Sequence, residues 1–407
     1  MTSENDPMDA SDESPTTVSA PLEDGNGGDH TAEQHPPARG NVTPPSPQPR
    51  SSRSLAAVAI KIVTFVGALF LFILALQLMK TGAKSVGPEI RGSFVFGNGV
   101  STLGLGWLSA YVVLSGSPVA ATSLTLFKGD LLTPLQTFTM LSGSRLGASF
   151  IVLLTGFLYA VRNRGHNRHE SIGMGVLALS LTAIVYLPGM LLGYWFLRSG
   201  LLDGINWHAS EDLLGVVDYV WGPVETFLYD LVPNDLWLML PIGLGILLVS
   251  FKLLDHVLPQ VSGDHQAQRR SDWLKKPWPM FLLGCLVATL TLSVSVALTV
   301  LVPLASKGYV KRKEAIPYIM GANITTLADT LVAAMLLGSA VAVRIVLAEA
   351  IGVSIVTLFY LAVLYKPVST GIMRFDDWVV DANTRLWVFV GVLFFMPVLL
   401  LCTGFFS

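Results

Sequence analysis

Two stretches of the chain share one pattern: LSGSPVAATSLTLFKGDLLTPLQTFTMLSGSR over residues 114–145, and LSVSVALTVLVPLASKGYVKRKEAIPYIMGAN over residues 292–323. Each begins with a Ser-x-Ser, continues as an apolar run and turns at a Lys-Gly pair. Each then reaches a glycine, Gly143 or Gly321, that opens a second apolar segment. The spacing from the second serine to this glycine is 26 residues in both copies (117 to 143 and 295 to 321). The chain therefore contains a duplicated unit.

The composition is that of a membrane protein. Of the 407 residues, 52% are hydrophobic and only 13% are charged, whereas a soluble protein carries about 25% charged residues. Residues 1–54 are rich in acidic residues and proline and contain no Phe, Trp or Tyr. Such a segment cannot bury enough apolar surface to fold, so we expect a disordered tail. The net charge of −2 comes without a basic domain, so no nucleic-acid partner is expected.

Membrane-spanning helices need about 20 mainly apolar residues each. Seven stretches meet this requirement: 55–79, 134–160, 171–198, 234–257, 315–338, 342–364 and 386–406. Two further apolar stretches, 94–127 and 279–305, contain glycine, proline or serine near their middle. We expect each of them to form two half-helices folded into a re-entrant hairpin. A broken backbone is tolerated inside a membrane only where protein or water surrounds it.

The positions of Lys and Arg predict the orientation. Basic residues gather in four predicted connections, at 161–170, 256–277, 306–314 and 365–385. The connection 199–233 has six acidic residues and no Lys or Arg, and only the segment 80–93 goes against the pattern. Because cytoplasmic loops carry the excess of Lys and Arg, the tail is predicted to be cytoplasmic and 199–233 extracytoplasmic. No signal-peptide-like segment precedes residue 55, and we expect a plasma-membrane location.

These features predict an all-α polytopic membrane protein built from two inverted repeats, 55–198 and 234–364. Each repeat has three spans and one re-entrant hairpin, and the odd number of crossings turns the second repeat upside down. The acidic segment 199–233 joins the repeats, and residues 365–407 form a loop and a final transmembrane helix. Inverted repeats with broken helices at mid-membrane are typical of secondary transporters.

The segment 321–330 is the most polar part of any predicted span. Asp329 lies near the middle of its span, where a carboxylate costs on the order of 2.5–3.5 kcal/mol, which favours a functional role. Asn323, Thr326 and Thr330 share one helix face. Such oxygens, with carbonyls freed by a broken helix, suit Na⁺; the alternative is a polar packing face between helices. The candidate cation ligands are Asn323, Thr325, Thr326 and Asp329.

The duplicated serines are candidates for an anion site. Hydroxyls and unpaired N–H groups at half-helix N-termini favour negative charge, although small residues also serve close helix packing. The candidates are Ser115, Ser117, Ser293 and Ser295. Arg145 occupies the place of Asn323 in the first copy, and three roles stay open for it. It could clamp a phosphate-like anion, pair with Asp329, or mark a half without a cation site.

Signatures of enzymes are missing from the sequence, which has no His-Glu-x-x-His, Walker loop or Gly-x-Ser-x-Gly elbow. The cysteines, Cys285 and Cys402, lie in apolar runs and indicate neither a disulfide nor a metal framework. We therefore expect no enzyme activity and no cofactor. The expected coupling ion is Na⁺.

The sequence Gly-Ala-Asn-Ile-Thr-Thr at 321–326, after Ala-Ile-Pro-Tyr-Ile-Met at 315–320, resembles the signature that follows the hairpin of the type II sodium/phosphate cotransporter family. The resemblance covers roughly residues 60–364. That family carries Gln-Ser-Ser-Ser in each repeat, which holds phosphate and Na⁺. The matching places here read Leu-Ser-Gly-Ser at 114–117 and Leu-Ser-Val-Ser at 292–295. Both glutamines and both middle serines are replaced, and Ser144-Arg145 stands where the family has Ala-Asn.

The resemblance implies Na⁺-coupled symport of inorganic phosphate or a similar small oxyanion. The partners it implies are this anion, Na⁺ and membrane lipid, and a homo-oligomer is one form of assembly to consider. Two alternatives stay open. The chain could carry another anion or couple to H⁺, with Asp329 as the proton carrier. It could also be a transport-inactive scaffold or sensor that has the same fold.

Overall fold

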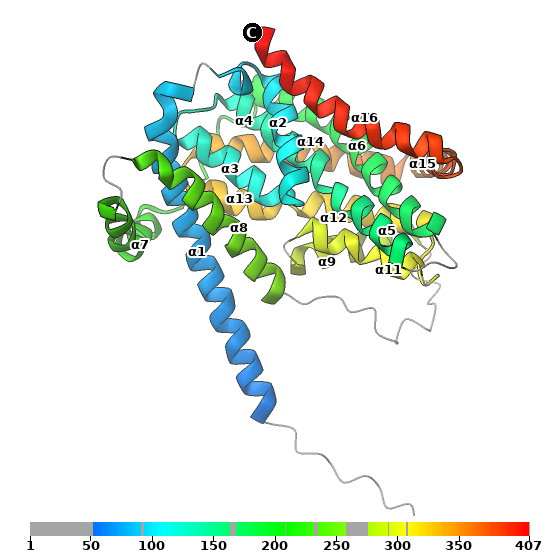
Figure 1. The fold of residues 1–407 in the computed structure, drawn as a ribbon, viewed down its shortest axis with the longest axis horizontal. Helices are drawn as coiled ribbons and strands as arrows, with labels where there is room; N and C mark the ends of the chain where they lie inside the picture. Colours follow the sequence, from blue (N-terminus) through cyan, green and yellow to red (C-terminus); the bar gives the residue numbers. More distant parts are fainter. Residues whose placement is uncertain are drawn as a thin grey trace, which may run out of the picture. The chain divides into compact units, whose positions relative to one another are not determined.

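The structure, a computed structural model, describes residues 52–90, 93–162, 168–207, 209–231, 235–257, 276–291, 293–306 and 308–406. All regular secondary structure in these ranges is helical (Figure 1). The first half contains α1 (Ser52–Ile90), α2 (Gly99–Val113), α3 (Gly116–Lys128), α4 (Pro134–Ala148), α5 (Phe150–Arg162), α6 (Arg168–Ser199) and α7 (Glu211–Leu231). The second half contains α8 (Met239–Val257), α9 (Pro277–Thr291), α10 (Val294–Thr299), α11 (Leu301–Ser306), α12 (Arg312–Thr325), α13 (Leu327–Leu336), α14 (Ala340–Ala362), α15 (Tyr365–Val380) and α16 (Asn383–Cys402). Residues 1–51 of the predicted tail lie outside the described residues.

Seven helical segments in the described part of the chain are long and apolar enough to cross a membrane. They are Ala59–Val86, Pro134–Arg162, His169–Ser199, Leu236–Leu254, Arg312–Leu336, Ala340–Ala362 and Asn383–Phe406. Each overlaps one of the seven predicted spans, so the prediction of an all-helical chain with seven spans is confirmed. Two of the segments join a pair of helices across one residue, α4 to α5 at Ser149 and α12 to α13 at Thr326.

Both copies of the Ser-x-Ser interrupt a helix, as predicted. Helix α2 ends at Val113 because Leu114 has a left-handed backbone (φ 58°), and α3 begins one residue after Ser115. In the second copy α9 ends at Thr291, and Ser293 is the N-cap of α10. The Ser293 side chain accepts a hydrogen bond from the backbone N–H of Val296, which satisfies one of the free donors at this helix start.

Paired glycines bring the first helix of each copy against the next long helix. A Cβ atom on Gly106 of α2 would lie 2.1 Å from the Met140 carbonyl oxygen of α4. The same value separates a Cβ on Gly284 of α9 from the Tyr318 carbonyl oxygen of α12. A second glycine lies at each crossing, Gly143 of α4 against α2 and Gly321 of α12 against α9. The two glycines of a crossing are 37 residues apart in both copies (106 to 143 and 284 to 321). Small residues at such crossings let helix backbones pack closely in a membrane.

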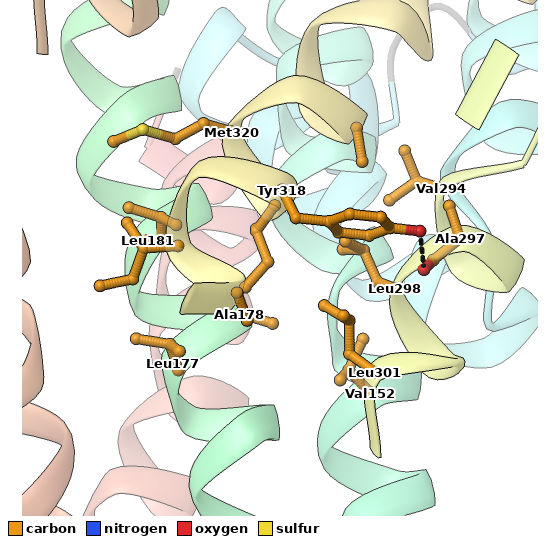
Figure 2. Close-up of a cluster of buried hydrophobic side chains, with 14 of the residues drawn as sticks. Val152, Leu177, Ala178, Leu181, Val294, Ala297, Leu298, Leu301, Tyr318 and Met320 are labelled. Carbon is orange, nitrogen blue, oxygen red and sulfur yellow. Dashed lines mark hydrogen bonds between the residues drawn. The ribbon is translucent and has the colours of Figure 1, made fainter. Parts of the chain in front are cut away.

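The two halves pack into one another. Helix α3 of the first half contacts α13 of the second, and α10 and α11 of the second half contact α5 of the first. Figure 2 shows part of this core, where Val152 of α5 and Leu181 of α6 lie among side chains of α10, α11 and α12. The Tyr318 hydroxyl of α12 donates to the Ala297 carbonyl of α10 at 2.9 Å. This contact fixes the second broken helix against α12.

Two predicted connections contain long helices. The segment 199–233 includes α7, and the segment 365–385, expected as a loop, forms α15 (Figure 1). Both helices are amphipathic, with an apolar stripe interrupted by charged residues. They fall short of the apolar length of a span because charges recur along them, which is also why the sequence suggested loops.

Candidate functional site

The two broken helices meet at their Ser-x-Ser positions. The hydroxyl of Ser295 donates a hydrogen bond to the carbonyl oxygen of Leu114 at 3.1 Å. A Cβ atom on Gly116 would lie 2.8 Å from the carbonyl oxygen of Ser144, so the first break packs directly on α4. The two breaks therefore touch at Ser295 and Leu114, and the first of them packs on α4.

The four serines have different surroundings. Ser293 is buried and caps α10 with its side chain, whereas Ser115 is the N-cap of α3 and makes no side-chain cap hydrogen bond. Ser117 is buried in the first turn of α3. Because the cap N–H groups at the start of α3 receive no hydroxyl from Ser115, this end retains donors and the positive end of the helix dipole. It has the chemistry needed to bind an anion.

A buried ion pair joins α4 and α13. The Arg145 guanidinium, 2% exposed, lies 3.6 Å from Oδ1 of Asp329, whose side chain is 10% exposed. Arg145 also donates to the Thr330 hydroxyl. Asp329 Oδ1 accepts from the backbone N–H of Thr330 at 2.6 Å and from its hydroxyl at 3.0 Å. Pairing with Asp329 was one of the three roles considered for Arg145, and the structure contains this pair.

Each partner of this pair keeps one polar atom without a hydrogen bond among the described residues, Nε of Arg145 and Oδ2 of Asp329. A buried polar atom without a partner is rare in proteins and usually indicates a ligand, a water or a second state. Each of these two atoms is therefore open to a further hydrogen-bond partner.

Asn323 joins α12 to α6. Its side-chain amide donates to Thr182 at 3.1 Å, and its backbone carbonyl accepts from the hydroxyls of Tyr186 at 2.8 Å and Thr326 at 3.0 Å. Thr325 instead donates to carbonyls of its own helix, at Gly321 and Ala322. Asn323 and Thr326 are thus buried, whereas Thr325 and Asp329 are half-buried.

Glu349 of α14 is not among the site residues that the sequence analysis predicts. This side chain is fully buried, and it contacts the Ser142 hydroxyl of α4, one turn before Arg145. Glu349 and Arg344 lie five residues apart in one span, a spacing that suggests charged residues of a pair between helices, but the structure shows Arg344 bound to Asp203 and Asn206. Glu349 is the only carboxylate in the predicted span 342–364, and that signal could have identified it.

No group of three or more His, Cys, Asp or Glu side chains that could hold a metal ion occurs among the described residues. Lys128, at the end of α3, is half-buried, and Lys307 lies outside the described residues.

Seven apolar helical segments in the described part of the chain indicate a protein embedded in a membrane. The sequence model of the Na⁺/Pi-cotransporter family matches residues 246–397, from α8 to α16. This match supports membership of the chain in that family and confirms the sequence resemblance over the matched residues. The first half of the expected range, from residue 60, lies outside the match. No curated protein and no solved structure matches the chain.

Proposed function

We propose that the chain is a Na⁺-coupled symporter for inorganic phosphate or a similar small oxyanion in the plasma membrane, with its N-terminus in the cytoplasm. One observation carries the proposal. The two Ser-x-Ser breaks meet beside the buried pair of Arg145 and Asp329. Broken helices at the interface of two halves are the usual place for the substrate and coupling ions of a secondary transporter.

The proposal includes two inverted repeats with re-entrant hairpins. Helices α2 and α9 have 15 residues each, which rise about 22 Å and cannot cross a hydrocarbon core of about 30 Å. Each is followed by a break and by shorter helices. The equal spacing of the glycine crossings supports a two-fold relation between the halves. So does the exchange of contacts, in which α3 packs on α13 while α10 and α11 pack on α5.

In this proposal the serines 115, 117, 293 and 295 hold the anion, with the N-terminus of α3 supplying backbone donors. The Ser295 bond to Leu114 opens when the anion enters, because the hydroxyl then turns to the substrate. Phosphate oxygens accept charge-assisted hydrogen bonds, which are about twice as strong as neutral ones. The helix start beside a guanidinium therefore favours an oxyanion over a neutral solute.

Arg145 and Asp329 provide the coupling. An anion that binds Arg145 withdraws the guanidinium from Asp329 and leaves a buried carboxylate without its counter-ion. Burying an unpaired charge is strongly unfavourable. A Na⁺ bound by Asp329, the hydroxyls of Thr325 and Thr326 and the Asn323 oxygens restores neutrality. The anion and the cation therefore stabilise each other's binding.

Uptake of radiolabelled phosphate into proteoliposomes tests the proposal. The wild type should accumulate phosphate when an inward Na⁺ gradient is present and not when K⁺ replaces Na⁺. Asn323→Ala should abolish this uptake. Thr289→Ala is the matched control, since Thr289 is exposed on α9 and its hydroxyl bonds only to its own helix.

The absence of Na⁺-dependent uptake by the folded wild type would overturn the phosphate symporter. Uptake driven by a pH gradient alone would favour the H⁺-coupled alternative. Uptake that is equal in the wild type and Asn323→Ala would remove α12 from the cation site and leave the transport function intact.

A further inference from the structure

Glu349 has an incomplete set of partners. It lies in the middle of α14, is 0% exposed, and its Oε1 atom makes no hydrogen bond in the described part of the chain. Its Oε2 atom contacts the Ser142 hydroxyl. An ionised carboxylate accepts several hydrogen bonds, and a buried one needs them or a counter-ion. Glu349 has only one such contact.

The Ser142 hydroxyl cannot satisfy an ionised Glu349. Ser142 Oγ also lies 3.0 Å from the carbonyl oxygen of Phe138, on its own helix. Both neighbours are acceptors if Glu349 is ionised, yet a hydroxyl has a single proton. A protonated Glu349 resolves this conflict, because the carboxylic acid donates to Ser142 and Ser142 donates to Phe138. The geometry is complete only with a proton on the carboxyl group.

The balance of charges around Glu349 also favours one protonated carboxyl group. Arg145 of α4 interacts electrostatically with Glu349, and Tyr186 of α6 interacts with Arg145, Glu349 and Asp329. The cluster therefore contains one cationic group and two carboxyl groups. Asp329 of α13 already has Arg145 at 3.6 Å and two hydrogen bonds from Thr330. The single positive charge is thus paired directly with Asp329, and among the described residues Glu349 has no ion pair of its own.

The remaining helices against α14 contribute no other counter-ion at this depth. Helices α3, α12 and α15 also pack on α14. The charged residue of α3 is its last, Lys128, and those of α12 are its first three, 312–314. Helix α15 follows α14, whose C-terminal end lies 13 residues beyond Glu349 (349 to 362), or about 20 Å. These charges cannot neutralise Glu349 directly.

We propose that Glu349 is a proton-binding site of the transporter, occupied in this state and emptied when Ser142 and Glu349 separate. The proton then leaves to water, and the carboxylate that remains accepts hydrogen bonds from water or binds a cation. The link to transport rests on the proposed function, whereas the protonation itself does not. Its consequence is a dependence of transport on pH that Glu349 sets.

Infrared spectroscopy of the purified full-length protein tests the protonation without any transport assay. A carboxylic acid absorbs at a C=O stretching frequency separate from that of a carboxylate. At neutral pH the wild type should show this band, and Glu349→Gln should lose the part that belongs to Glu349, while the part from Asp376, whose burial also favours the protonated form, remains in both. Asp203→Asn, which removes an exposed carboxylate on Arg344, is the control and should keep the band. A band that persists unchanged in folded Glu349→Gln would overturn the proposal.

Ser142→Ala keeps the test decisive if Glu349→Gln does not fold. Loss of the hydroxyl partner should shift the C=O band of Glu349, and an unshifted band would contradict the assignment. In proteoliposomes, uptake by the wild type should decrease towards alkaline pH, and uptake by Glu349→Gln should decrease less. An equal pH dependence in both would remove the role in transport. If the wild type transports no phosphate, the proposed function fails, and the infrared result still decides the protonation.

Discussion

Ser295 of the second broken helix donates a hydrogen bond of 3.1 Å to the carbonyl oxygen of Leu114 in the first. The acceptor is available because α2 ends at Val113 and the left-handed backbone of Leu114 turns its carbonyl away from the helix. The bond joins the two copies of the duplicated sequence at the position where each helix is interrupted. A relative movement of the two halves must therefore begin by breaking or exchanging this bond.

Ser295→Ala should lower the melting temperature of the detergent-solubilised protein. The variant loses a bond between halves and leaves the Leu114 carbonyl without this donor, a loss of about 1 kcal/mol. Thr299→Ala is the control, since the Thr299 hydroxyl bonds only to the Val296 carbonyl of its own helix. Equal melting temperatures for the two variants would contradict a role of Ser295 in holding the halves together.

Leu114→Gly should leave the protein as stable as the wild type or more stable, because glycine adopts φ 58° without the penalty of about 1–2 kcal/mol that other residues incur. Val113→Gly, one residue earlier in the right-handed helix, should destabilise by roughly 1 kcal/mol. Thermal unfolding compares the two variants. If both were destabilised to the same extent, the break would not depend on the backbone conformation of Leu114.

The spans and the helix breaks could be predicted from the sequence because each depends on local composition. Apolar length predicted all seven spans, and the Gly, Pro and Ser residues within 94–127 and 279–305 predicted interrupted helices. Helices α7 and α15 were harder to predict, since charged residues recur along both and resemble loops in an apolar-length test.

The details of the site depend on how helices pack, which the sequence pattern does not contain. The pattern treats Ser115 and Ser293 as equivalent, yet only Ser293 caps its helix with its side chain. Glu349 and Arg344 are five residues apart and so point to different sides of α14, and each finds its partner on another segment. The register of α14 against α4 decides the contact with Ser142.

Gly284→Ala and Gly106→Ala should each destabilise the protein by roughly 1–3 kcal/mol. In both variants the new methyl group would lie 2.1 Å from a backbone carbonyl oxygen of the crossing helix, so the helices must separate. Gly245→Ala is the control, because no atom lies within 4 Å of a Cβ at this position of α8. It should be neutral or slightly stabilising. If Gly245→Ala lowered the melting temperature as much as the other two variants, the effect would come from replacing any helix glycine and not from the helix crossings.

Asp329→Asn should destabilise the folded protein by about 3–5 kcal/mol, because it leaves the buried Arg145 without its counter-ion. The double variant Arg145→Met with Asp329→Leu should recover most of the stability. It should show no phosphate uptake. Asp203→Asn is the control. The Asp203 side chain is exposed, so its ion pair with Arg344 contributes only about 0–1 kcal/mol to the free energy of unfolding. If Asp329→Asn had the stability of the wild type, the pair would not be the internal counter-ion on which the coupling depends.

A second ionic cluster joins three helices at the start of α12. The Arg312 guanidinium contacts Asp376 of α15, and it lies 3.2 Å from Glu170 of α6 and 3.0 Å from Asp377. Asp376 is 0% exposed, whereas Asp377 is about half-exposed. Burial raises the pKa of the Asp376 carboxyl to about 7, and the charge of Arg312 opposes this increase. Asp376 therefore changes charge near neutral pH.

The cluster should make the stability of the protein depend on pH. In the unfolded chain Asp376 has an ordinary pKa of about 3.9, so between this value and about 7 the folded protein binds more protons than the unfolded one. Stability then decreases as the pH rises through that window, because the unfolded state releases the proton more readily. Asp376→Asn should reduce the fall in melting temperature between about pH 5 and about pH 8. Asp377→Asn removes the more exposed carboxylate that pairs with Arg312. This variant should keep the fall in melting temperature. A pH dependence unchanged in Asp376→Asn would assign the effect to another group and leave Arg312 with a permanently charged partner on α15.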